Sequence, residues 1–186
     1  MLKNLSKKFF SDNIVIVNGK RTAVGSFMGR LSNIHGTLLG SAAIQGALQA
    51  SKVNHEEIDE VIMGNVISAG LGQAPARQAA LKAGLKTNTV CTTINKVCSS
   101  GMKAVDFAYQ SIKTGNSNIV VAGGFESMSL VPHYLYIRKA YPWGTANMID
   151  GIQFDGLTDS VHKNLMGNCT EKTMKELNIS RKEQDE

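Results

Sequence analysis

Apolar positions along the chain occur in short unbroken runs, separated by longer stretches with helical spacing. Short runs of this kind predict buried strands, which we expect at residues 14–17, 61–67, 90–97 and 118–122. Helical spacing and end signals predict helices at 37–52, from 75 to about 82, at 99–113 and at 167–177. Because strands alternate with helices, the expected fold class is α/β, with a mostly parallel sheet covered by helices on both faces.

Single residues indicate where the predicted helices begin and which side chains face the core. Thr37 is expected to cap the first helix, and Pro75 to open the second. The helix at 99–113 is expected to turn most of its large apolar side chains inward, namely Met102, Val105, Phe107 and Ile112.

The pattern changes at both ends of the chain, and we predict three parts. Residues 1–11 carry three lysines, two serines and no acid, with an apolar helical face. This is the outline of a mitochondrial presequence, although an ordinary basic tail is the alternative. Residues 12–129 form the predicted α/β domain. From residue 130 to residue 186 we expect a looser region, because 131–159 has no clear period.

Composition narrows the functional classes. The chain has 186 residues, of which 42% are hydrophobic and 19% charged, as in soluble globular proteins. No apolar run approaches the ~20 residues of a membrane-spanning helix, so we expect no membrane insertion. The net charge of +5 indicates either a solvated surface or an anionic partner such as a phosphorylated small molecule. No basic run has the form of a nucleic-acid arm, so no nucleic-acid partner is expected.

The three cysteines, Cys91, Cys98 and Cys169, are odd in number and irregularly spaced. This pattern fits neither a disulfide framework nor a Cys-x-x-Cys metal site, so we expect free thiols in a reducing compartment and no metal. Cys91 and Cys169 are expected to serve packing.

Cys98 is expected at the last position of a strand or the first position of a helix. A helix N-terminus favours a thiolate, which is the nucleophilic form, and its N–H groups can hold an oxyanion. Gly101 keeps the start of the helix open to a bulky substrate. A nucleophile for covalent acyl chemistry is therefore one interpretation, and a small buried residue is the other. Residues 126–129 either approach a site at the carboxyl end of a strand or form a turn that stabilises that end.

Four stretches resemble segments of the thiolases, in that family's order and at its spacing. They are KRTAVGSF at 20–27, GLGQAPARQA at 70–79, NKVCSSGMKA at 95–104 and GGFESMS at 123–129, the last with phenylalanine where the family has methionine. The resemblance covers nearly all of the chain after residue 11. Within the family, CTTINKVC at 91–98 and DGLTD at 155–159 are most similar to the mitochondrial or biosynthetic acetoacetyl-CoA thiolases.

The resemblance implies a thiolase-like α/β fold with a sheet of the five-stranded type, incomplete in this chain, and a loop domain that starts at residue 130. It implies acetyl-CoA C-acetyltransferase activity, with Cys98 as the acyl-thioester nucleophile and its backbone N–H in an oxyanion hole. The substrates would be acetyl-CoA, acetoacetyl-CoA and CoA, with no covalently bound cofactor. The resemblance also implies a homo-oligomer, either a dimer or a tetramer. The expected location is the mitochondrial matrix, with the cytoplasm as the alternative.

Two departures from the family pattern qualify this expectation. Leu165 stands where the family commonly has a histidine near the substrate, whereas Met166 matches a residue that lines the pantetheine channel. Thiolases also continue into a second half, which carries the histidine that activates the nucleophile and a second cysteine. We therefore expect slow or absent acylation and an exposed apolar sheet face or edge. A truncated non-catalytic fragment or splice form, or a related condensing enzyme of the same fold, is the alternative.

Overall fold

A computed structural model describes residues 13–138 and 143–186, so the predicted leader at 1–11 lies outside the described residues. The chain divides into two compact units, with the boundary between Leu130 and Val131. Each unit is described by itself.

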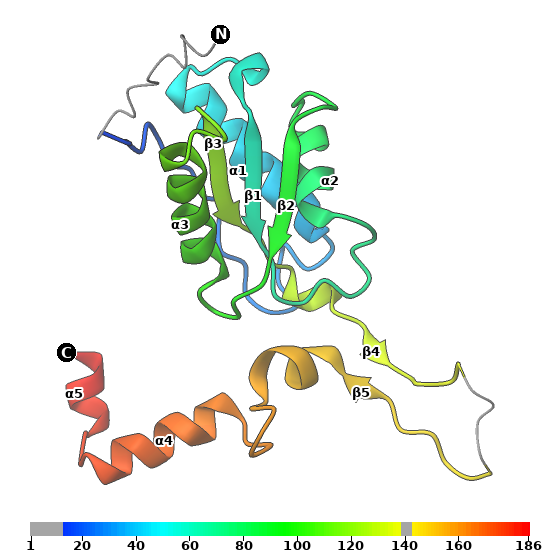
Figure 1. The fold of residues 1–186 in the computed structure, drawn as a ribbon. Coiled ribbons are helices and arrows are strands. Elements are labelled where there is room, and N and C mark those ends of the chain that lie inside the picture. The colour runs from blue at the N-terminus through cyan, green and yellow to red at the C-terminus, as the bar shows by residue number, and fades with distance from the viewer. Residues whose placement is uncertain (1–12, 139–142) are drawn as a thin grey trace, which may run out of the picture. The chain divides into compact units, whose positions relative to one another are not determined.

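The first unit is built on a three-stranded parallel sheet in the order β2-β1-β3 (Figure 1). The strands are β1 (Glu60–Gly64), β2 (Val90–Ile94) and β3 (Val120–Gly124). In this register Gly64 lies opposite Ile94 on one side and Gly124 on the other. The carboxyl ends of all three strands therefore meet at one edge of the sheet, where α/β folds place their ligands.

Helices cover both faces of this sheet, as the alternating pattern predicts. On one face, α1 (Gly36–Ser51) and α2 (Pro75–Lys82) pack on Val61 and Met63 of β1. On the other face, α3 (Ser100–Lys113) packs on Ile62. Side chains of β1 alternate between the two faces, so this central strand joins both apolar clusters. The single-turn helix η1 (His55–Glu57) leads into β1.

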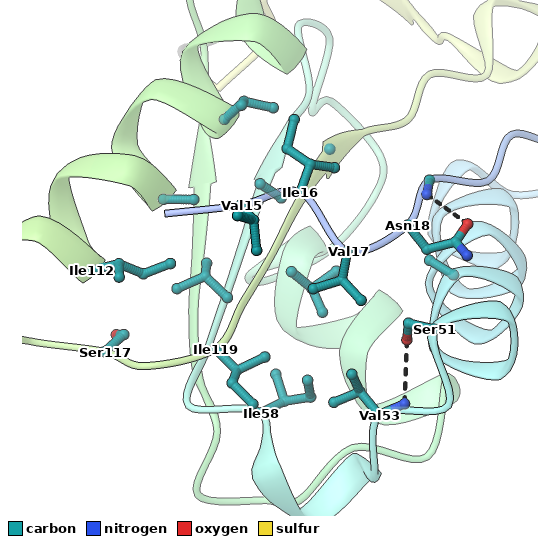
Figure 2. A pocket seen from close by; sticks show the side chains of 18 of the residues that line it. Val15, Ile16, Val17, Asn18, Ser51, Val53, Ile58, Ile112, Ser117 and Ile119 are labelled. Atoms are coloured by element: carbon teal, nitrogen blue, oxygen red, sulfur yellow. Dashed lines mark hydrogen bonds between the residues drawn. The ribbon is translucent and has the colours of Figure 1, made fainter. Parts of the chain in front are cut away.

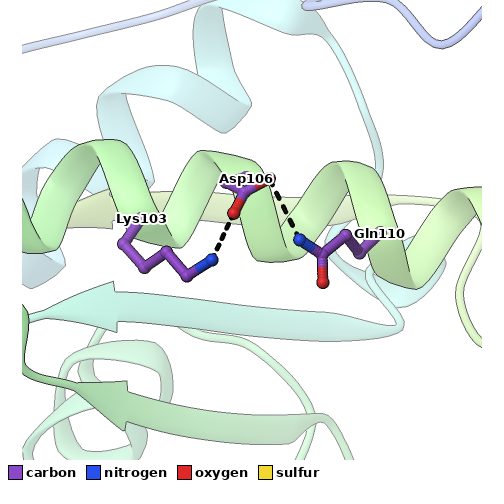
Figure 3. A network of polar contacts seen from close by, with 3 residues as sticks. All are labelled: Lys103, Asp106 and Gln110. Carbon is purple, nitrogen blue, oxygen red and sulfur yellow. Dashed lines mark hydrogen bonds and ion pairs between the residues drawn. The ribbon is translucent and has the colours of Figure 1, made fainter.

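The predicted inward face of α3 is wrong. Met102 is 77% exposed, and Val105 and Phe107 are also exposed, whereas Ala104 and Ala108 are buried. Small side chains face the sheet because α3 lies too close to β1 for large ones. On the outer side, Lys103 contacts Asp106, which also accepts a hydrogen bond from Gln110 (Figure 3).

The predicted strand at 14–17 is also wrong. Residues 13–26 form no helix or strand, and Val15, Ile16 and Val17 are 62–83% exposed. They line a cavity of about 830 Å³ together with Ile112 of α3 and Ile119 beside β3 (Figure 2). The segment lies across this cavity from β3, and a strand requires a hydrogen-bonded neighbour.

Several predicted ends shift by a few residues. The sheet strands end at Gly64, Ile94 and Gly124 rather than at 67, 97 and 122, and α1 begins at Gly36. Thr37 does not cap α1, because the N-cap position is His35 and Thr37 lies buried in the first turn. The prediction that Pro75 opens a helix ending near Lys82 is confirmed.

The second unit is a succession of short elements with little burial. They are β4 (His133–Tyr134) paired with β5 (Ile149–Asp150), the π-helical segment η3 (Ile152–Leu157), α4 (Met166–Glu176) and α5 (Arg181–Asp185). The first unit ends in the single turn η2 (Met128–Leu130). Among the described helices, none is long and apolar enough to cross a membrane.

Candidate active site

Cys98 lies in the turn that joins β2 to α3, and it is exposed. The sequence predicts Cys98 as the last residue of a strand or the first residue of a helix, and this prediction is wrong. Cys98 follows the end of β2 at Ile94 and stands two positions before Ser100, the first residue of α3. The turn is closed by the N–H of Ser99, which donates to the Lys96 carbonyl at 3.1 Å, and by the N–H of Ser100, which donates to Val97 at 3.1 Å. Because Cys98 is exposed beside a helix N-terminus, the interpretation as a buried small residue is wrong, and the role of nucleophile stays a prediction.

Val97, directly before Cys98, has a left-handed backbone with φ of 49°. This conformation is unfavourable for a β-branched residue and persists only where its surroundings hold it. The Asn95 Oδ1 accepts a hydrogen bond from the Val97 N–H at 2.8 Å. The Ser100 hydroxyl donates to the Val97 carbonyl at 2.6 Å and accepts from the Lys96 N–H at 2.8 Å. Side chains on both sides of Cys98 therefore hold the turn in place.

Glycines bring the start of α3 close to the sheet edge. A Cβ on Gly64 would lie 2.6 Å from the Ser100 carbonyl carbon, and one on Gly124 would lie 3.0 Å from the Gly64 oxygen. The first distance leaves no room for a side chain at Gly64, and the second leaves very little at Gly124. A Cβ on Gly101 would meet nothing within 4 Å, so the space beside the helix start is open, as the sequence predicts.

Glu126 follows β3 and binds the loop that follows β1. Its carboxylate accepts hydrogen bonds from the Asn65 side chain at 2.9 Å, the Val66 N–H at 2.8 Å and the Ile67 N–H at 3.3 Å. Burial raises the pKa of Glu126, and these three hydrogen bonds act in the opposite direction. Of the two roles that the sequence leaves open for residues 126–129, the structure supports a turn that stabilises the strand ends.

The remaining residues of that motif also bind neighbouring loops. The Ser127 hydroxyl donates to the Ile34 carbonyl at 2.8 Å, and the Ser129 hydroxyl accepts from the Met28 N–H at 2.9 Å. Phe125 is buried against α1. The motif thus connects the loops before α1 to the carboxyl edge of the sheet.

The other two cysteines have different surroundings. Cys91 is half-buried in β2, where burial raises the pKa of its thiol, while Arg77 acts in the opposite direction. Cys169 is exposed on α4 in the second unit, so the prediction that it serves packing is wrong. In residues 13–138 and 143–186, no three His, Cys, Asp or Glu side chains gather into a possible metal site.

The residues singled out near 165 belong to the second unit. Leu165 is the N-cap of α4 and Met166 its first residue, and both side chains are partly exposed.

Sequence reasoning missed the residues that hold the Cys98 turn. These residues are Asn65, which is buried beside Glu126, together with Asn95 and Gly64. Amide and glycine side chains carry no reactive group that would mark them as functional. The one available signal is that Gly64 interrupts an apolar run and therefore marks a close backbone approach.

Comparisons with known proteins agree with the motifs around this site. The family model described as "Thiolase, N-terminal domain" matches residues 14–186. The mitochondrial acetyl-CoA acetyltransferase of Mus musculus is 54% identical over 174 residues, which are 94% of this chain and 41% of that protein. The human protein of the same name is 54% identical over 172 residues, or 92% of this chain and 40% of that protein.

Among solved structures, the Acat5 thiolase of Ascaris suum in complex with coenzyme A matches with a TM-score of 0.86 and 41% identity. The match covers 89% of this chain and 43% of that one. The chain therefore spans about two-fifths of the length of these relatives.

Proposed function

This chain is a member of the thiolase family, and on that basis we propose that Cys98 is the nucleophile of an acetyl-CoA C-acetyltransferase. The observation that carries the proposal is the exposed Cys98 sulfur in a braced turn directly before α3. The names of the relatives supply the reaction class, and the chain's own geometry supplies a residue suited to it.

In the proposed first half-reaction, the Cys98 thiolate attacks the carbonyl carbon of an acyl-CoA thioester. The new sulfur–carbon bond forms as the bond to the CoA sulfur breaks, and CoA leaves as a thiolate that takes up a proton. The backbone N–H of Cys98 is the proposed donor to the transient oxyanion, assisted by the positive end of α3. In the second half-reaction, another acetyl-CoA loses an α-proton, and the resulting carbanion attacks the carbonyl carbon of the Cys98 thioester. The bond to the Cys98 sulfur breaks as the carbon–carbon bond forms, and Cys98 leaves as a thiolate that can take up a proton. In the reverse direction, a CoA thiolate attacks the same carbonyl and displaces the Cys98 thiolate.

The proposed substrates are acetyl-CoA, acetoacetyl-CoA and CoA, bound as substrates rather than as a resident cofactor. The related Ascaris suum thiolase was solved in complex with coenzyme A, which supports this substrate class. We assign Met166 to the pantetheine channel, in a loop domain that begins at residue 130. Because Leu165 cannot make the hydrogen bonds of a histidine, substrate binding at that position rests on apolar contact.

The proposed assembly is a homo-oligomer, a dimer or tetramer, in the mitochondrial matrix. The relatives are named mitochondrial acetyl-CoA acetyltransferases, which supports the location. Among the strands that the structure describes, β2 lies at an edge of the three-stranded sheet, with β1 as its neighbour. Pairing of such edge strands between two subunits is one way to form the proposed dimer.

A non-catalytic binding role is the second candidate. The apolar cavity between β3 and residues 14–17 favours it, because such a surface is normally covered by further polypeptide. If this role is correct, the chain binds full-length thiolase subunits and transfers no acyl group by itself. Co-purification of the tagged chain with untagged full-length subunits tests this role, and recovery of the tagged chain alone would contradict it.

Acyl trapping tests the catalytic proposal. The folded chain is incubated with acetyl-CoA, quenched in acid and digested, and acetylation is measured separately for each cysteine-containing peptide. We expect slow acetylation at Cys98, and none at that peptide in Cys98→Ala. Equal acetylation of Cys98 and Cys169 would contradict the proposal, and acetylation of neither cysteine would favour the binding role for this chain.

A further inference from the structure

A continuous line of hydrogen bonds runs from Glu126 to the residue that precedes Cys98. The Glu126 Oε1 accepts from the Ile67 N–H at 3.3 Å, and the carbonyl of the same peptide group, that of Val66, accepts from the Asn95 Nδ2 at 3.0 Å. The Asn95 Oδ1 then accepts from the Val97 N–H at 2.8 Å. One peptide group and one side-chain amide thus connect a carboxylate after β3 to the turn after β2.

The line crosses the sheet edge at its central strand. Asn65 strengthens the crossing, since its N–H donates to the Ile94 carbonyl at 3.0 Å and its side chain donates to both Glu126 and the Phe125 carbonyl. The Asn65 Oδ1 accepts from the Ser68 hydroxyl at 2.6 Å, so this buried amide has partners on both sides. Hydrogen bonds in series polarise one another, and a partly buried network is stronger than its separate pairs.

Val97 shows why the Cys98 turn needs such support. Its left-handed backbone is the unfavourable one for a β-branched residue, and release of the Val97 N–H would let the peptide before Cys98 rotate toward an extended conformation. Such a rotation would move the Cys98 sulfur away from the start of α3. The hydrogen bond from Val97 to Asn95 therefore determines where the sulfur lies relative to the positive end of the helix.

We propose that Asn95 and Glu126 are positioning residues, which hold the Cys98 sulfur at the N-terminus of α3 through the peptide group between Val66 and Ile67. The inference rests on the proposed role of Cys98 as a nucleophile. Neither residue acts on the substrate itself. Their effect is on the reactivity of Cys98 rather than on the folding of the domain as a whole.

The test compares alkylation rates of the three cysteines by iodoacetamide, with peptides separated by mass spectrometry. The measured quantity is the rate at Cys98 divided by the rate at exposed Cys169 in the same sample. Asn95→Ala and Glu126→Ala should lower this ratio about fivefold, the factor that corresponds to the loss of one ordering hydrogen bond. Glu126→Gln, which keeps an oxygen toward Ile67, should restore most of the ratio.

Two matched controls separate positioning from stability. Glu60 is also a half-buried carboxylate, and it accepts from two serine hydroxyls at the far end of β1. Asn54 also accepts from a nearby N–H, in the cap of η1. Glu60→Ala and Asn54→Ala should lower the thermal midpoint without changing the Cys98 ratio. Slow labelling of half-buried Cys91 reports in every sample that the first unit is folded.

Each outcome has one meaning. An unchanged Cys98 ratio in Asn95→Ala and Glu126→Ala, with Cys91 still protected, would overturn the positioning role and leave the nucleophile intact. If Cys98 of the unaltered chain reacts no faster than Cys169, the proposed function itself fails. Should Glu126→Ala lose Cys91 protection, Asn95→Ala decides the test, because the Asn95 side chain is exposed.

Discussion

Polar groups at the strand ends are satisfied by specific partners, and this is clearest at single residues. Asp59, just before β1, accepts hydrogen bonds from the Asn118 N–H at 2.7 Å and the Ile119 N–H at 3.2 Å. These bonds tie the start of β1 to the segment that enters β3. They also lower the pKa of Asp59 below its usual value of 3.8, mainly through the Asn118 N–H.

The first prediction concerns the acid sensitivity that follows from Asp59. A lowered pKa in the folded state means that the carboxylate stabilises the fold above pH 3.8, and that this contribution is lost as pH falls through the folded pKa. Because Asp59 is exposed, we expect at most about 1 kcal/mol. Asp59→Asn should remove that part of the pH dependence in urea unfolding. An identical acid loss in the variant and the unaltered chain would contradict this assignment.

At the scale of elements, glycines determine how closely helices approach their neighbours. In α1, a Cβ on Gly40 would lie 2.6 Å from the Phe125 ring, whereas one on Gly46 would lie 3.5 Å from the Lys20 side chain. The same residue type in the same helix therefore has two roles. Gly40 makes room for a buried aromatic ring, while Gly46 has ordinary space around it.

The second prediction compares alanine at these two glycines. Alanine in a helix normally gains about 0.5–1 kcal/mol over glycine, but overpacking a buried contact costs about 1–3 kcal/mol. Gly40→Ala should therefore lower the free energy of unfolding by about 1–2 kcal/mol, whereas Gly46→Ala should raise it or leave it unchanged. Denaturant unfolding of both variants measures the difference. Equal stability would show that the Phe125 ring can shift without cost.

The sequence predicts some elements well, and the reasons are physical. Pro75 fixes a helix start locally, and the alternation of strands and helices predicts a parallel sheet with helices on both faces. The inward face of α3 is not predictable in this way. Only small side chains, those of Ala104 and Ala108, fit between the helix and β1, and that distance is not evident from the helix sequence. The strand predicted at 14–17 fails because pairing depends on a neighbour rather than on the segment itself.

The same division applies to the candidate site. Cys98, the chemical residue, is recognisable from its motif and from the adjoining helix start. The residues that hold its turn are amides, glycines and main-chain groups from three separate loops. Their roles arise only when the parallel strands bring those loops together at one edge.

At the scale of the molecule, the apolar cavity is a surface of the first unit that further polypeptide could cover. Ile16 is 83% exposed and lines this cavity with Val15 and Val17. Burying an exposed isoleucine side chain is worth about 1.5–3 kcal/mol, which favours association through this surface. This region corresponds to the exposed apolar sheet face or edge that the sequence predicts.

The third prediction concerns self-association through the cavity. Ile16→Lys places a charge on the cavity wall and should weaken association about tenfold or more, because the apolar gain is lost. Val24→Lys is the matched control, since Val24 is 76% exposed and does not line the cavity. Sedimentation at several protein concentrations measures both variants. Equal weakening by both would point to a general charge effect instead of this surface.

The central claim is that Cys98 is an activated nucleophile, and competitive alkylation of the unaltered chain tests it most directly. Limiting iodoacetamide is added to the folded protein at neutral pH, and the labelling rate of each cysteine is measured. The account predicts that Cys98 reacts faster than Cys169, although both are exposed, and that half-buried Cys91 reacts slowest. Labelling of Cys98 at a rate equal to or below those of Cys91 and Cys169 would contradict it.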